Sequence, residues 1–360
     1  MKRDFLAFPL VLILTLPAVS AAPYWTKPGV YIEYAAMRYE PYIQYRLSQG
    51  DRPEWIQTSL MVYNYSGGVL YILRTFNDTI VEFRLKKERD YIRSNVQVTL
   101  YNVSISTTLP KDISPPVFWN ESEVIETEVE NSHDLGGFED WKWYRFHVKK
   151  VVISGEYLIR VKDYHVIKGN MDYGHTMLFD DPANPLNKGG DSFSLYPISI
   201  KIQDARIDNE RVLKGRYTQF YPPTKTVVTE AYALNITQPF GKGYNILSIL
   251  MGTLIYTFDA SDGKLIATYN DGPDLWAVGI LDAHFTDEYG QYKVEVEHKE
   301  SYASGLVLRS FKIAGENVKG EVSFNKPIAK AAYLFYASLV LLGLGLVLNI
   351  KASDKRGGGD

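Results

Sequence analysis

A run of oxygen-bearing side chains marks one loop where this chain could hold a metal ion. The run lies among Pro and Gly residues and consists of Asp180, Asp181, Asn184, Asn187 and Asp191. Hard oxygen ligands in a flexible loop are what Ca²⁺ takes. The spacing matches no EF-hand, however, and Asp and Asn are common in loops because they form Asx-turns. Two interpretations stay open, a calcium loop and a loop structured by its own hydrogen bonds, and the sequence favours the second.

Asparagines in Asn-x-Ser/Thr sequons are the second set of candidate sites. There are five of them: Asn64, Asn77, Asn102, Asn120 and Asn235. Each is a glycan acceptor if the chain is exported into a compartment that glycosylates. Because four of the five precede residue 121, we expect the carbohydrate mainly on the N-terminal part. The alternative is that some of them are ordinary turn asparagines.

The sequence contains no recognisable catalytic motif. The histidines show neither HxxxH nor HxH spacing, and GxSxG, HExxH and P-loop patterns are absent. Ser261 and Lys264 fit SxxK, but they fall in a predicted hairpin turn, whereas that serine needs its lysine one helical turn away. The chain has no cysteine, which excludes disulfides, thiolate metal sites and cysteine nucleophiles. We therefore predict no catalytic residue and no cofactor except calcium.

Two tryptophans could instead bind a sugar. Trp141 and Trp143 fall on one face of a strand-like run that ends at Lys149, with Tyr144 and Phe146 on the other face. Exposed aromatic rings in such a pair can stack on sugar rings. Ordinary packing within a sheet explains the same pattern and is the interpretation we favour.

The elements that must position these residues are strands. Apolar residues alternate with polar ones in four separate runs: Val30–Tyr34, Ile159–Val161, Ile198–Ile202 and Val294–Val296. Period-two alternation places one face on a core and the other in water, as in antiparallel sheets. Turn signals at Ser66-Gly67-Gly68, Asp262-Gly263 and Asp271-Gly272-Pro273 separate such runs. We predict a mostly β, antiparallel protein with twisted or curved sheets, in a sandwich or a half-barrel.

Three details refine this prediction. Residues 254–258 and 265–269 flank Asp262-Gly263 and are typical of one hairpin. Residues 246–258 are apolar but too short for a membrane span, which indicates a strand buried on both faces. Between Asn95 and Ser106 the apolar parity changes from even to odd numbers. That change predicts a β-bulge or a strand break near Leu100 and Tyr101.

An acidic, glycine-containing stretch divides the chain. It predicts an N-terminal β-domain at 23–115, a linker or long hairpin at 116–140, and a larger β-domain at 141–325. A single continuous sheet that spans both parts is the alternative.

Apolar segments lie at both ends of the chain. Residues 1–21 have the basic start, apolar centre and small-residue end of a signal peptide, with cleavage after Ala21; an uncleaved signal anchor is the alternative. Residues 327–350 include 20 uncharged residues from Ala331 to Ile350, enough for one transmembrane helix of about 30 Å. We therefore predict a single-pass protein of the cell membrane, with its ectodomain outside and residues 351–360 in the cytoplasm.

Composition narrows the classes of partner. The formal net charge of −3 provides no basic field for nucleic acid. The expected partners are the lipid bilayer and a protein or glycan partner at the cell surface. The 27 tyrosines suit strands that are half buried, since the ring packs on the sheet while the hydroxyl stays hydrated.

Short segments of the chain resemble those of a known group. The segments are Pro28–Tyr34, Gly174–Pro182 and Tyr256–Ile266. They are similar to segments of uncharacterised archaeal membrane-anchored cell-surface proteins, which combine a signal peptide, a tyrosine-rich β ectodomain and one C-terminal transmembrane helix. The group has no established activity, so the resemblance assigns no catalytic residue. The hairpin is also similar to those of curved half-barrel sheets that cradle lipids, as in lipoprotein carriers.

Three functions follow as hypotheses. The first is a non-enzymatic surface protein that binds a partner, a glycan or an envelope component. The second is a carrier or sensor of an apolar ligand, with Leu250, Leu254, Ile255 and Ile266 lining a cavity in a curved sheet. The third is a surface hydrolase with a metal at the 180–191 loop.

Overall fold

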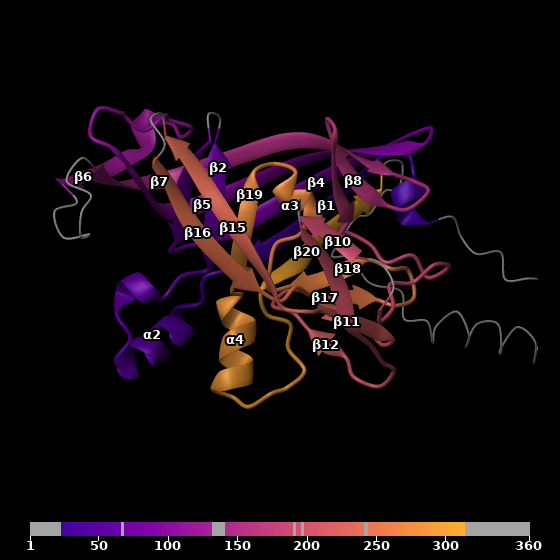
Figure 1. Ribbon diagram of the computed structural model, residues 1–360. Coiled ribbons are helices and arrows are strands. Elements are labelled where there is room, and N and C mark those ends of the chain that lie inside the picture. The colour runs from indigo at the N-terminus through magenta and orange to yellow at the C-terminus, as the bar shows by residue number, and fades with distance from the viewer. Residues whose placement is uncertain are drawn as a thin grey trace, which may run out of the picture. The chain divides into compact units, whose positions relative to one another are not determined.

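The computed structural model describes residues 23–65, 68–131, 141–189, 192–195, 198–240 and 244–313. Strands dominate these residues, and every strand pairing is antiparallel, which confirms the mostly β, antiparallel prediction (Figure 1). In this described part, no helix combines the length and the apolar character that a membrane crossing needs. The predicted signal peptide at 1–21 and transmembrane helix at 327–350 lie outside the described residues.

The helical elements are short. They are the 3-10 helices η1 (Tyr24–Thr26), η2 (Pro53–Trp55) and η3 (Glu121–Glu123) and the α-helices α2 (Glu40–Ser48), α3 (Pro273–Trp276) and α4 (Glu288–Glu295). The strands are β1 (Val30–Ala36), β2 (Ser59–Tyr65), β3 (Val69–Thr75), β4 (Thr79–Glu88), β5 (Tyr91–Pro110), β6 (Val124–Asn131), β7 (Trp141–Arg160), β8 (His165–Lys168), β9 (Met171–His175), β10 (Ser192–Leu195), β11 (Ile198–Asp208), β12 (Leu213–Lys214), β13 (Gln219–Phe220), β14 (Thr224–Thr229), β15 (Tyr232–Phe240), β16 (Tyr244–Gly252), β17 (Ile255–Asp259), β18 (Leu265–Thr268), β19 (Ile280–Phe285) and β20 (Leu306–Ile313).

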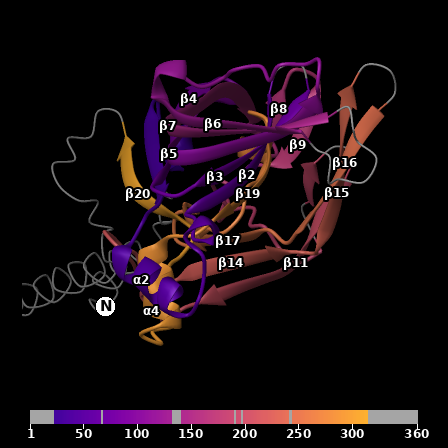
Figure 2. The same cartoon turned by 90° about the vertical axis from the view of Figure 1, so that its left-hand side faces the viewer.

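One large sheet contains most of these strands. Its order is β19-β2-β3-β5-β4-β1-β20-β18-β17-β14-β11-β10-β9-β8-β7-β6. Strand β5 also pairs with β7, near the other end of this order. The strands from β5 to β7 therefore form a closed, hydrogen-bonded ring that runs through β4, β1 and β20 and returns through β8 and β7. In Figure 2, β5 and β7 lie above and β11 and β14 lie below. The large buried aromatic side chains of Trp25, Trp276, Tyr34 and Tyr256 belong to the core.

The described part of the acidic stretch, residues 116–131, contributes a strand to this sheet. Strand β5 precedes the stretch and β7 follows it, and the two pair from Tyr91 opposite Arg160 to Pro110 opposite Trp141. The stretch itself supplies η3 and β6, and β6 pairs with β7. Strands from both predicted β-domains therefore share one sheet, as in the continuous-sheet alternative.

The parity change in β5 corresponds to a change of strand partner. Residues Tyr91–Leu100 pair with β4, and residues Val103–Ser106 pair with β3. Between them Asn102 adopts a left-handed φ of 58°, a conformation that asparagine tolerates better than most residues. Burial moves from even to odd positions at this point. The predicted irregularity is confirmed, one residue beyond Leu100 and Tyr101.

One local prediction was wrong. The alternation at Val294–Val296 predicted a strand, but residues Glu288–Val296 contain helix α4, with Asp287 as its N-cap through a 3.0 Å bond from the Gly290 amide. Two alternating valines are too few to outweigh a capped helix start. The turn signal at Asp271-Gly272-Pro273 lies between β18 and β19, as predicted, and the segment is buried and leads into α3.

The hairpin prediction is confirmed. Strand β17 pairs with β18 across the turn at Asp262-Gly263, with Tyr256 opposite Thr268. The apolar run 246–258 contains two strands, β16 and β17, and they belong to different sheets. Strand β16 pairs with β15 in a separate two-stranded sheet, and β12 and β13 form another.

Candidate functional site

Strand register brings four distant side chains into one row. Arg74 on β3 lies opposite Ser104 on β5, and Ser104 lies opposite His147 on β7. His147 in turn lies opposite Glu126 on β6. Directly opposed residues of antiparallel strands project from the same face of a sheet, with their Cβ atoms about 5 Å apart. Arg74, Ser104, His147 and Glu126 therefore form a continuous polar row across four strands.

This row lines a surface cleft of about 480 Å³. The segment that carries α2 and η2 forms the facing wall. The lining residues, which we call the arginine cleft, are Arg38, Ile43, Pro53, Glu54, Ile56, Arg74, Phe76, Asn102, Ser104, Glu126, Glu128, Arg145 and His147. Cationic, anionic and apolar side chains thus share one site, a mixture that suits a ligand with both polar and apolar parts.

The three arginines of the cleft differ in their partners. Arg38 donates through Nη1 to the carbonyl of Phe76 at 2.8 Å. Arg145 lies 3.3 Å from Glu128 and 4.1 Å above the centroid of the Trp143 ring. Arg74 is exposed, and within the described ranges its side chain has neither a hydrogen bond nor an ion pair. Its guanidinium is therefore the cationic group of the cleft that is free for a ligand.

Asn102 and His147 fix each other at the edge of the cleft. The Asn102 Oδ1 and His147 Nε2 atoms are 2.5 Å apart, and the imidazole lies parallel to the Phe76 ring at 6.5 Å. When the amide oxygen accepts this bond, Nε2 carries the proton and Nδ1 stays an acceptor. Asn102, which has a left-handed backbone and is a predicted glycan acceptor, therefore lies in the wall of the cleft.

The predicted calcium loop uses its carboxylates internally. Asp180 accepts a 2.6 Å bond from the Leu186 amide at Oδ1, and the Lys225 ammonium lies 2.7 Å from Oδ2. Asp181 accepts bonds from the Tyr164 hydroxyl at 2.8 Å and from the Ala183 amide at 2.9 Å. These contacts are those of a loop structured by its own hydrogen bonds.

The other described candidate residues of the loop, Asn184 and Asn187, bond to backbone carbonyls of the same loop. The Asn184 amide donates to the Asp181 carbonyl, and the Asn187 side chain donates to the Pro185 carbonyl at 2.9 Å. Asp191 lies outside the described residues. Among the residues that the structure does describe, no group of three or more His, Asp or Glu side chains is arranged to hold a metal ion. Calcium at this loop stays a prediction.

The sequons occupy unlike environments. Asn64, Asn77 and Asn120 are exposed, and the Asn120 side chain accepts bonds from the Ser122 amide and hydroxyl at 3.1 and 2.9 Å. Asn102 is half-buried in the middle of β5. Asn235 lies on β15. The structure thus places three of the four N-terminal sequons at the surface.

The tryptophan pair follows the packing interpretation. Trp141 is only 6% exposed, and the half-buried Trp143 is covered by Arg145. On the opposite face the Tyr144 and Phe146 rings are stacked at 6.5 Å. Trp141 and Trp143 therefore do not form an exposed stacking platform.

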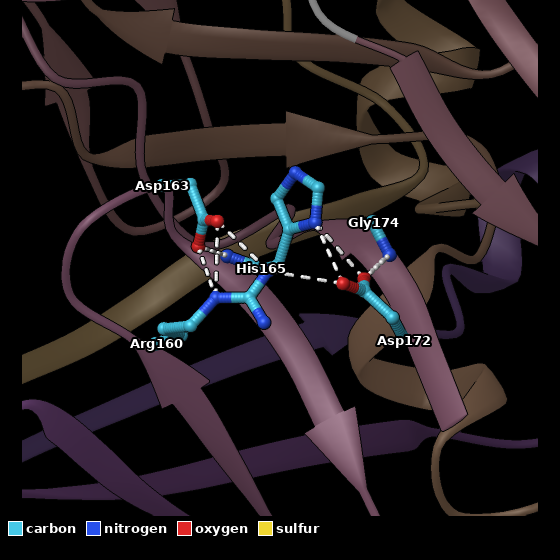
Figure 3. A network of polar contacts seen from close by, with 5 residues as sticks. All are labelled: Arg160, Asp163, His165, Asp172 and Gly174. Atoms are coloured by element: carbon cyan, nitrogen blue, oxygen red, sulfur yellow. Dashed lines mark hydrogen bonds and ion pairs between the residues drawn. The ribbon is translucent and has the colours of Figure 1, made fainter. Parts of the chain in front are cut away.

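A second polar network ties the ends of β7, β8 and β9 (Figure 3). Arg160 bonds Asp163 at 2.8 Å and Asp172 at 3.0 Å, and His165 Nδ1 lies 2.9 Å from Asp172. Burial alone would raise the pKa of Asp172, but the Gly174 amide, His165 and Arg160 together hold it below its usual value. Both carboxylates already have hydrogen-bond partners within the network. We therefore interpret the network as a structural one that holds the β8–β9 hairpin against the end of β7.

The chain matches no protein-family model, no curated protein and no solved structure. The resemblance to archaeal cell-surface proteins therefore stays a prediction. The only support for the arginine cleft as a binding site is its geometry. Arg74, Glu126 and His147 could not be predicted from the sequence as one site, because they meet only through strand register. The sequence did contain one indication of this site. Arg145 and His147 are odd-numbered residues of the run 141–149, as Trp141 and Trp143 are, so they were expected on the same face of one strand.

Proposed function

We propose that this protein is a membrane-anchored, extracytoplasmic binding protein and that the arginine cleft receives an anionic group of its partner. The observation that carries the proposal is the unpaired guanidinium of Arg74 in a cleft of about 480 Å³. A guanidinium presents a planar fork of donors that matches carboxylate and phosphate oxygens. Export and anchoring rest on the two apolar end segments of the sequence.

The groups beside Arg74 support recognition of more than a bare anion. Ser104 and His147 continue the polar row and can bond the hydroxyl or amide groups of a ligand. Ile43, Ile56 and Phe76 provide apolar surface in the same cleft. A partner that carries a carboxylate or phosphate on a partly apolar frame fits this lining.

The test is a titration of the full-length chain with inorganic phosphate and, separately, with an oligogalacturonate as a carboxylate probe. Calorimetry at low and moderate salt should show binding of at least one probe that weakens with salt, since the contact is ionic. Arg74→Gln should weaken it about tenfold. Arg211→Gln, which removes an exposed guanidinium outside the cleft, is the matched control and should leave it unchanged. Equal losses in both variants, or no binding of either probe at millimolar concentration, would contradict the proposal.

A surface hydrolase is the second candidate. Glu54 from η2 and Glu126 from β6 line the arginine cleft from two different elements. Two carboxylates that flank one sugar linkage can act as acid and base or as acid and nucleophile. A hydrolase would cleave the oligogalacturonate and lose turnover, while keeping binding, in Glu54→Gln or Glu126→Gln. A binding protein would release no product.

The hypothesis of an apolar-ligand carrier has less support. Leu254 and Ile266 are fully buried in the core, and none of the five clefts described in this structure is lined by either residue. The hypothesis needed these two side chains, together with Leu250 and Ile255, to line a cavity. Ile255 is half-buried, and the side chain of Leu250 lies outside the described part of the structure. The burial of Leu254 and Ile266 favours a binding function at the surface clefts.

A further inference from the structure

A second cleft lies on the other side of η2. Its volume is about 400 Å³, and α2, η2, β19 and α4 contribute to its walls. Ile56 lines both clefts, whereas Glu54 lines the arginine cleft and Trp55 lines this one. We call it the aromatic cleft and define it by Trp55, Gln57, Tyr269, Thr286 and Glu295.

Two aromatic side chains in this cleft are unusually exposed. Trp55 is 58% exposed and Tyr269 is 42% exposed. The Arg52 guanidinium lies over the Trp55 ring, 5.2 Å from its centroid, and so covers one face of the indole. More than half of the Trp55 surface is nevertheless exposed, which leaves indole surface for a ligand. Exposed rings of this size lose hydration when a ligand covers them, and this favours binding.

Neutral hydrogen-bonding groups accompany the rings. In the part of the chain that the structure describes, the side-chain amide of Gln57 and the hydroxyl of Thr286 have no hydrogen-bond partner. Together they offer both donors and acceptors. Hydroxyl groups, which donate and accept, are the complement of such a set.

Arg46, Glu295 and His284 of the cleft each have a partner, and His284 lies 3.8 Å from Asp282. The Tyr42 hydroxyl donates to Glu295 at 3.0 Å and accepts from Arg46 at 3.0 Å, and Arg46 also pairs with Asp51. This chain of contacts joins α2 to α4 and holds the wall in place. It leaves little uncompensated charge for an ionic ligand, so the cleft favours a neutral one.

We propose that the aromatic cleft binds a neutral saccharide, with one sugar ring lying on the exposed surface of the Trp55 indole and its hydroxyl groups bonded to Gln57 and Thr286. A pyranose has an apolar face of C–H groups and a rim of hydroxyls, which matches an aromatic platform beside neutral polar groups. This saccharide site is independent of the arginine cleft. Its proposed contacts are Trp55, Gln57 and Thr286, and none of these residues lines the arginine cleft.

The experiment uses the full-length chain and four neutral hexasaccharide series, of glucose, mannose, galactose and N-acetylglucosamine. Binding is followed by intrinsic tryptophan fluorescence and by saturation-transfer NMR. At least one series should bind and perturb tryptophan emission. Trp55→Ala should weaken that binding about tenfold or more, and Trp55→Phe, which keeps an aromatic face, should weaken it less. Gln57→Ala should cause a smaller loss than Trp55→Ala.

Two controls separate this site from other effects. Tyr91→Ala removes an exposed aromatic ring at the start of β5, outside every described cleft, and should leave saccharide binding unchanged. Arg74→Gln should also leave it unchanged, so failure of one cleft is distinguishable from failure of the other. Because Trp55 is largely exposed, its variants should keep the thermal midpoint of the parent. No binding at about 10 mM, full binding by Trp55→Ala, or an equal loss in Tyr91→Ala would overturn the proposal.

Discussion

The carboxylate of Asp180 and the ammonium of Lys225 form an ion pair inside the protein. Their Oδ2 and Nζ atoms are 2.7 Å apart, and both side chains are 5% exposed. Asp180 belongs to the loop after β9 and Lys225 to β14, so the pair joins segments 45 residues apart. The second oxygen of Asp180 accepts the Leu186 amide, so both carboxylate oxygens are satisfied. The pair thereby fixes the start of the loop that was a candidate for calcium.

Removing one member of this pair should destabilise the fold strongly. Lys225→Met leaves the Asp180 carboxylate buried without its counter-charge, and we expect the free energy of unfolding to fall by about 3–5 kcal/mol. Urea denaturation measures this change. Arg211→Gln, which breaks the exposed pair with Asp208, is the control and should cost less than about 1 kcal/mol. Similar losses in the two variants would contradict a special role for the buried pair.

Calcium should not change the stability of the protein if the loop is held by its own hydrogen bonds. A ligand that binds only the folded state stabilises it by RT ln(1 + [L]/Kd), so the thermal midpoint rises with the logarithm of the ligand concentration above Kd. We expect the same midpoint with about 1 mM Ca²⁺ and with a chelator, because Asp180 and Asp181 already have partners. A higher midpoint in Ca²⁺ that Asp181→Ala abolishes would establish the calcium interpretation instead.

Gly263 should tolerate no side chain. It has a left-handed φ of 72°, and a Cβ atom there would lie 1.9 Å from the Asp180 carbonyl oxygen. Gly169 has a similar φ of 58° but open space around it, which makes it a matched control. We expect Gly169→Ala to cost about 1–2 kcal/mol from backbone strain alone. Gly263→Ala should cost at least about 2 kcal/mol more, measured by urea denaturation. Equal costs would mean that the contact with Asp180 relaxes freely.

Two buried carboxylates at the start of α4 make stability depend on pH. Burial raises the pKa of Asp287 to about 6 and that of Glu288 to about 7, although backbone amides from Met37 and Tyr39 act in the opposite direction. The folded state therefore holds these protons to higher pH than the unfolded state does. Their contribution to stability is fully present below the usual pKa values of 3.8 and 4.5 and is lost as pH rises to about 6 and about 7.

Glu288→Gln should flatten this dependence. The variant keeps an oxygen that can accept the 2.7 Å bond from the Tyr39 amide but has no proton to lose. Between pH 4.5 and about 7 we expect its stability relative to the parent to rise by about 3 kcal/mol. Urea denaturation at several pH values tests this. The exposed Glu300→Gln is the control and should follow the parent, and an unchanged profile in Glu288→Gln would contradict the assigned pKa.

Glycan occupancy should differ among the sequons. In a host that glycosylates the exported chain, we expect carbohydrate on Asn64, Asn77 and Asn120, which are exposed, and none on Asn102. The Asn102 side chain contacts His147 in the middle of a long strand, so its amide nitrogen is not presented in a flexible segment. Peptide mapping by mass spectrometry measures each site. Occupancy of Asn102 equal to that of Asn120 would be the contrary result.

Local pattern in the sequence was enough for the type of several strands. Alternation identified β1, the end of β7 and β11, because a half-buried strand repeats every two residues. The parity change in β5 located the irregularity at Asn102, and the Asp262-Gly263 turn located the β17–β18 hairpin. The same rule failed at Val294–Val296, where the N-cap bond of Asp287 settled the helix.

Which strands pair, and with what register, was decided only by the tertiary structure. The row from Arg74 to Glu126 joins β3, β5, β7 and β6, and no local pattern relates these residues. A shift of one residue in any of these pairings would move a member of the row to the opposite face of the sheet, and the arginine cleft would lose that side chain. The aromatic cleft likewise exists because α2, η2, β19 and α4 meet in space. Strand type is a local property of the chain, whereas both candidate sites depend on packing between distant segments.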